Sequence, residues 1–165
     1  MKKSLLILSL SMFLILSGCG KSSNVVEYND GFVALVKECT DSTQDLFKVY
    51  QSNESTLDSI SQSLEDCISI CDKSREKASK MWDFDKDSSL KDAVVDLLST
   101  EVDYLQKFWS TKTYWNIDNI TEEDKVAYES IVNDLYQTEE ILNSKFTSLQ
   151  TTQEAFAAKH GLKLE

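Results

Sequence analysis

The chain has 165 residues and a formal net charge of −11 at pH 7, and it contains no proline and four glycines. A surface this acidic repels phosphate backbones, which excludes nucleic-acid binding as a function. A β-sandwich of this length needs many turns, and the chain has too few turn-forming residues to build them. Composition therefore favours an all-α protein with no nucleic-acid partner.

The first 20 residues have the order of a secretory signal peptide. Lys2 and Lys3 give a positively charged start, and residues 5–16 are apolar apart from two serines. This apolar stretch is shorter than the roughly 20 residues that a membrane-spanning helix requires. We therefore predict that residues 1–18 are a cleaved lipoprotein signal peptide, with a retained membrane anchor or a plain cleaved signal as the alternatives.

The predicted signal peptide ends in Leu16, Ser17, Gly18 and Cys19, and this ending resembles a bacterial lipobox. In a lipobox, diacylglycerol is attached to the cysteine thiol and cleavage leaves that cysteine as the first residue. The resemblance implies that Cys19 is the lipidation site and that acyl chains hold the protein in a membrane. Gly20 permits residence in the outer membrane or at the cell surface. We expect an extracytoplasmic, membrane-anchored protein of the cell envelope.

The remaining chain reads as a short tether and one helical domain. Residues 19–25 are the predicted lipidated cysteine and tether, and residues 26–165 are the predicted domain. Apolar residues recur every three or four positions in four segments, with breaks near residues 51–54, 83–88 and 116–120. Short breaks between long helices favour antiparallel neighbours, which predicts an up-down-up-down four-helix bundle. We expect Phe108 and Trp109, late in the third segment, to lie in its core.

Several residues near the breaks have the properties of helix ends. Gly161 is placed to end the fourth helix as a C′ glycine. His160, the single histidine, is interpreted as a helix-end residue that complements the helix dipole rather than as a catalytic base or ligand. Three pairs have the spacing of a capping box and predict helix starts: Ser55 with Asp58, Ser89 with Asp92, and Thr121 with Asp124.

Beyond Cys19 the chain has three cysteines, and outside the cytoplasm a disulfide can form between two of them. Cys67 and Cys71 are four residues apart on one predicted helix, which makes a bond between them awkward and favours a bond to Cys39 on another helix. If the first two helices fold back near Asn53, Cys39 lies opposite Cys67. A turn two residues later would select Cys71 instead. We predict a Cys39–Cys67 disulfide, with Cys71 as the alternative partner, and three buried thiols as the alternative to any bond.

The alternating acids Asp83, Asp85 and Asp87 are similar to the start of an EF-hand loop. The rest of that motif fails, because Ser88 stands where the sharp turn wants glycine and Val94 stands where a bidentate glutamate is needed. These carboxylates are a weak metal candidate, and an acidic turn between helices is the favoured interpretation. We predict no metal and no cofactor.

Tyr114 and Trp115 lie beside the third break, where aromatic side chains can anchor a partner. They are the candidate partner-binding residues. The alternative is that they plug the end of the bundle.

Taken with the lipobox, the four-helix pattern resembles the small uncharacterised helical lipoproteins of bacteria, and residues 26–30 are similar to the start of some of their domains of unknown function. The resemblance implies a bundle displayed at the envelope and carries over no catalytic residues. We therefore hypothesise a non-enzymatic, membrane-anchored interaction module whose partner is an envelope protein. The alternative is an envelope sensor or carrier that binds a small ligand or a metal ion within or at the end of the bundle.

Overall fold

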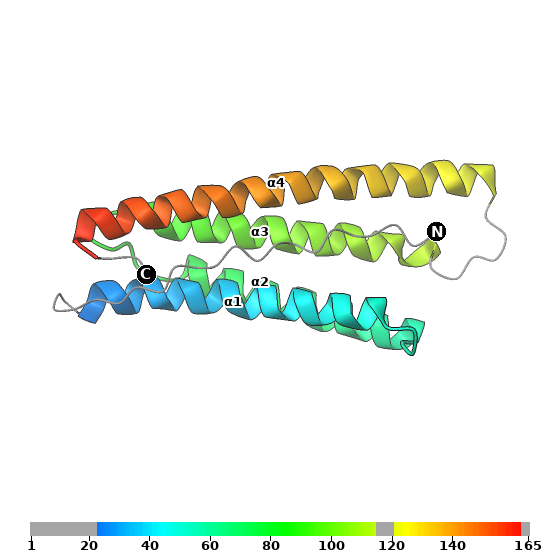
Figure 1. Ribbon diagram of the computed structural model, residues 1–165, viewed down its shortest axis with the longest axis horizontal. Helices are drawn as coiled ribbons and strands as arrows, with labels where there is room; N and C mark the ends of the chain where they lie inside the picture. Colours follow the sequence, from blue (N-terminus) through cyan, green and yellow to red (C-terminus); the bar gives the residue numbers. More distant parts are fainter. Residues whose placement is uncertain (1–22, 115–120, 163–165) are drawn as a thin grey trace.

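The computed structural model describes residues 23–114 and 121–162, and this part of the chain is helical with no β-strand, as the composition predicts. None of the described helices has an apolar stretch sufficient to span a bilayer. The predicted signal peptide, Cys19 and Trp115 lie outside the described residues. The elements are α1 (Ser23–Gln51), α2 (Leu57–Ser79), α3 (Ser89–Ser110), the short 3-10 helix η1 (Thr111–Tyr114) and α4 (Glu122–His160) (Figure 1).

The helices lie lengthwise beside one another, and α3 packs against both α2 and α4 (Figure 1). Later residues of α3 contact earlier residues of α4: Asp96 pairs with Lys145, whereas Lys107 pairs with Asp134. These two helices therefore run antiparallel. A buried hydrogen bond, from Gln153 Nε2 to Asn29 Oδ1 at 2.9 Å, joins α4 to α1.

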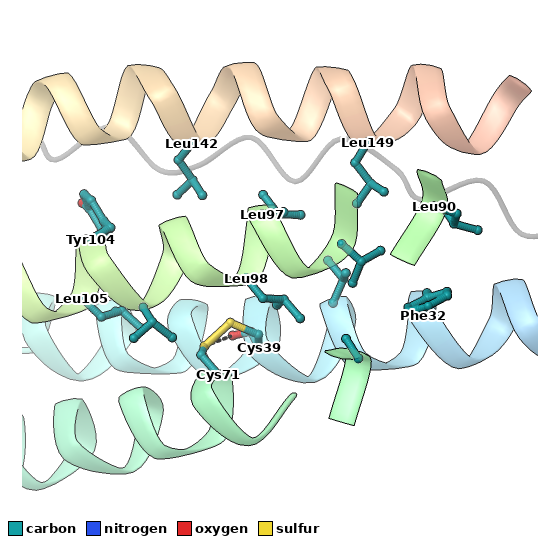
Figure 2. Close-up of a cluster of buried hydrophobic side chains, with 14 of the residues drawn as sticks. Phe32, Cys39, Cys71, Leu90, Leu97, Leu98, Tyr104, Leu105, Leu142 and Leu149 are labelled. Atoms are coloured by element: carbon teal, nitrogen blue, oxygen red, sulfur yellow. Dashed lines mark hydrogen bonds between the residues drawn. A yellow bond between two sulfur atoms is a disulfide. The ribbon is translucent and has the colours of Figure 1, made fainter. Parts of the chain in front are cut away.

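All four α-helices contribute leucine or aromatic side chains to one core (Figure 2). Each apolar stripe predicted from the sequence supplies fully buried residues. The stripe lies on one face of its helix, and its side chains are removed from water only where another helix covers that face. Phe108 is buried as expected, whereas Trp109 is half-buried and packs at the edge of the core. Labelled core residues in the close-up are Phe32, Leu90, Leu97, Leu98, Tyr104, Leu105, Leu142 and Leu149.

The turn between α1 and α2 lies later in the chain than the sequence suggested. The N-cap of α2 is Thr56, whose hydroxyl accepts a hydrogen bond from Ser59 N, and the Ser59 hydroxyl accepts one from Thr56 N. The predicted Ser55–Asp58 capping box is therefore wrong by one residue. Ser59, at the third position of α2, can replace the usual glutamate of a capping box, because its hydroxyl accepts a hydrogen bond as a carboxylate would.

This later turn decides the disulfide. The bond joins Cys39 to Cys71, with the Cα atoms 4.6 Å apart, and Cys67 is a buried free thiol (Figure 2). The prediction that Cys67 is the partner is wrong, and the alternative, Cys71, is correct. The physical reason is register: with the turn centred near residue 55, Thr43 rather than Cys39 stands opposite Cys67.

The other predicted helix ends are partly correct. Thr121 and Asp124 form a capping box, and Gly161 ends α4 in the left-handed conformation with φ 66°. The Ser89–Asp92 box is wrong, since Ser89 is already the first residue of α3. There Asp87 Oδ1 accepts a hydrogen bond from Ser89 N at 3.0 Å and satisfies a free amide of the first turn.

Replacing Cys39 and Cys71 together by serine will lower the free energy of unfolding by about 4 kcal/mol, because the disulfide closes a loop of 32 residues. Urea denaturation of the double variant against wild type measures this loss. Cys67→Ser is the matched control and leaves the bond intact, so its loss will be much smaller. Tandem mass spectrometry of non-reduced peptides that found Cys39 linked to Cys67 would contradict the assignment.

Candidate functional site

Three helices bring one polar side chain each to the centre of the bundle. Glu101 of α3 is 2 % exposed, and its Oε1 accepts a hydrogen bond from the Thr43 hydroxyl of α1 at 2.8 Å. The thiol of Cys67, on α2, lies 3.6 Å from Thr43 Oγ1. Glu101 Oε2 has no hydrogen-bond partner among the described residues. The cluster stands beside the Cys39–Cys71 disulfide, since Thr43 is one helical turn after Cys39.

Burial determines the charge of this cluster. It raises the pKa of Glu101 to about 7, although the hydrogen bond from Thr43 acts in the opposite direction. Burial also raises the pKa of the Cys67 thiol. A thiol with a raised pKa is a poor nucleophile, because the thiolate is the reactive form. The cluster can therefore hold or release a proton, and it is unsuited to nucleophilic catalysis.

The sequence interpretation missed Glu101, although the pattern carried a signal. Glu101 lies four residues after Leu97 and four before Leu105, and both leucines are buried. An acid in the middle of an apolar stripe occupies a core position, since residues four apart share one helix face. Applied to the third segment, this rule identifies Glu101 as a buried carboxyl.

A groove of about 330 Å³ runs along the surface between α2 and α3. Its carboxylates are Glu65 and Asp72, and its aromatic wall is the half-buried Trp109. Asp72 is also paired with Arg75 at 2.6 Å. The remaining lining residues are Ile68, Ser69 and Gln106.

The chemistry of the groove suits an organic cation. Carboxylates attract an ammonium or guanidinium group, and an indole ring binds one through its π face. The protein already shows this second interaction, since the Lys112 ammonium lies 4.3 Å from the centre of the Trp109 ring. Sequence reasoning missed the groove because Glu65 and Asp72 are on the polar face of α2, and only the docking of α3 brings Trp109 beside them.

The three acids of the turn between α2 and α3 face different side chains and do not converge. Asp83 pairs with Lys91, Asp87 pairs with Lys159, and Asp85 Oδ2 lies 3.7 Å from His160 Nδ1. The contacts with Lys159 and Ser89 hold the pKa of Asp87 well below its usual range. Within residues 23–114 and 121–162, no group of three acids, histidines or cysteines is arranged to hold a metal ion. The weak calcium candidate therefore lacks the geometry of a site.

The imidazole of His160 is packed against aromatic rings at the end of α4. Its ring centre lies 5.0 Å from that of Phe84 and 4.5 Å from that of Phe156. The side chain is 10 % exposed. His160 is a helix-end residue in position, as predicted, and its contacts make it part of the packing there.

Tyr114, the described member of the aromatic pair, closes η1 and packs on the start of α4. Its ring centre lies 5.4 Å from that of Tyr128. This contact accords with the end-plug interpretation of Tyr114. Trp115 and Cys19 lie outside the described residues.

No protein-family model, curated protein or solved structure matches this chain.

Glu101→Gln will flatten the pH dependence of stability. Between about pH 4.5, the ordinary value for a glutamate, and about pH 7, folded Glu101 holds a proton that the unfolded chain releases. The free energy of unfolding of the wild type therefore falls as pH rises through this window, by about 3 kcal/mol. Glutamine keeps the shape and the acceptor for Thr43 but carries no titrating group.

Urea denaturation at pH 5 and at pH 8 tests this for both proteins. Glu140→Gln, at an exposed position of α4, is the control and should keep the wild-type dependence. Equal pH dependence in wild type and Glu101→Gln would show that Glu101 does not hold the proton.

Proposed function

We propose that this chain is a bacterial envelope lipoprotein, from which residues 1–18 are removed and in which Cys19 carries the lipid. Its up-down-up-down bundle acts as a non-enzymatic binding module close to the membrane. The tether supports this arrangement, because α1 begins at Ser23, four residues after Cys19. A chain of four residues reaches at most about 14 Å, so the body stays beside its anchor.

The observation that carries the binding role is the groove between α2 and α3. Glu65 and Asp72 lie on one side and Trp109 on the other, and this combination recognises a lysine or arginine side chain. The net charge of −11 would steer a basic segment of an envelope protein toward the groove. We propose that the partner is a protein that presents such a segment.

The alternative function uses the same groove for a small organic cation, as an envelope sensor or carrier would. Its volume of about 330 Å³ is at the lower end of the range for small-molecule pockets. The two functions differ in the size of the ligand. A basic peptide gains affinity from those of its own cationic side chains that bind outside the groove, whereas the affinity of a small cation depends on the groove alone.

The anchor is tested by Cys19→Ala in the bacterial envelope. Cys19 is the predicted attachment point, so the variant should remain an uncleaved precursor, while the wild type should fractionate with membranes. Mass spectrometry of the mature wild type should show an acylated cysteine at its start. An unmodified Cys19 at that position would overturn the proposal.

Glu65→Gln will weaken binding of a fluorescein-labelled hexalysine peptide about fivefold, equivalent to about 1 kcal/mol, because it removes one carboxylate of the groove. Fluorescence anisotropy at low salt measures the affinity. Glu129→Gln, at an exposed position on α4, makes the same change in net charge and should have little effect.

Equal weakening by Glu65→Gln and Glu129→Gln would mean that diffuse charge, not the groove, attracts the peptide. Tetramethylammonium is the small-cation probe. Binding of this ion that depends on Glu65, without binding of hexalysine, would favour the alternative function.

A further inference from the structure

The start of α1, the end of α2 and the end of α4 form one end of the bundle, which we call the α1-start end. Figure 1 shows the start of α1 and the end of α4 on the same side of the molecule. Ring contacts join α1, the segment that follows α2, and α4: the ring centre of Tyr28 lies 5.6 Å from that of Trp82 and 5.6 Å from that of Phe156. The turn at residues 83–88 completes this end.

Trp82 projects from the α1-start end into solvent. Trp82 is 62 % exposed, whereas Tyr28, whose ring it contacts, is fully buried. The indole therefore contacts the ring of a buried core residue and presents much of its surface outward. The other large hydrophobic residues exposed in the described chain all belong to α4 before residue 142 and lie away from this end: Val126, Tyr128, Tyr136 and Ile141.

Three carboxylates near Trp82 are paired with lysines. Asp83 pairs with Lys91 and Asp87 with Lys159, while Lys80 pairs with Glu76 at 2.7 Å. These pairs reduce the local excess of negative charge in a protein that is otherwise strongly acidic. This end of the bundle can therefore approach lipid headgroups with less repulsion than an unpaired acidic turn would meet.

We propose that the α1-start end docks on the bilayer surface with the Trp82 indole in the headgroup layer. This inference rests on the proposed anchoring at Cys19. The anchor lies four residues before Ser23, so lipidation would hold this end within about 14 Å of the acyl chains. Tryptophan favours this interfacial layer, because its ring is apolar and its N–H can still find a hydrogen-bond partner.

Docking at this end also explains how the groove stays accessible. Ile68 in the groove lies 11 residues before Ser79, the last residue of α2, which corresponds to about 16 Å along the helix. A bundle that stands on Trp82 therefore presents the α2–α3 groove well above the headgroups. The partner is a lipid surface, and the zwitterionic headgroup of phosphatidylcholine matches the paired charges around the indole.

The experiment uses the mature protein as isolated from the bacterial envelope. It is mixed with phosphatidylcholine vesicles whose acyl chains carry bromine near the headgroups, which quenches nearby tryptophan. In the brominated vesicles, wild type should emit less tryptophan fluorescence than it does in unbrominated vesicles. The fluorescence that remains in the brominated vesicles should be less blue-shifted than the emission in unbrominated vesicles. Trp82→Phe should lose this quenchable fraction. Trp109→Phe is the matched control and should retain it, because Trp109 lies in the groove. Flotation of each variant with the vesicles is measured in parallel.

Two outcomes separate docking from anchoring. If wild type and Trp82→Phe both float and their tryptophan emission is quenched equally, the docking is overturned and the anchor is left intact. Wild type that fails to float would overturn the lipid anchor, and the docking that depends on it. Quenching that is lost in Trp82→Phe while flotation persists supports the inference.

Discussion

The register between α1 and α2 is the constraint on which the rest of the bundle depends. The reciprocal hydrogen bonds of Thr56 and Ser59 fix where α2 begins, and the position of every α2 side chain opposite α1 follows from that start. In this register Cys39 meets Cys71, and Thr43 meets Cys67. A shift of half a helical turn between α1 and α2 would separate the bonded sulfur atoms and move Thr43 away from Cys67, because both contacts use the same face of α1.

Burial of Glu101 in this core costs folding free energy. Its carboxyl group lies in an apolar core with one hydrogen bond, and its other oxygen has no partner among the residues that the structure describes. Such a group opposes folding when it is charged. The surrounding leucines and the disulfide offset that cost, and the acid in turn makes other registers unfavourable, since only the observed one gives it Thr43 as a partner. A buried polar group can thus select one arrangement while reducing its stability.

Polar chemistry is unevenly distributed over the outside of the bundle. Asp83 and Asp87 of the turn near Trp82 each face a lysine, whereas in the open groove Glu65 and the Arg75-paired Asp72 stand beside an indole. The first arrangement compensates charge where the chain approaches its proposed anchor. The second leaves negative potential and an aromatic surface together, which is the combination that recognises cations.

The sequence by itself determined the four helical segments, the capping box of Thr121, the end at Gly161 and the possibility of a Cys39 disulfide, because these depend on spacing along the chain. It could not decide between Cys67 and Cys71, since two residues in the turn change which thiol is opposite. It held the signal for Glu101, an acid within an apolar stripe. Only the tertiary structure placed Thr43 and Cys67 around that acid, brought Trp109 beside Glu65 and Asp72, and separated the three turn acids. Those groupings join residues from different helices, and periodicity within one helix carries no information about its neighbour's register.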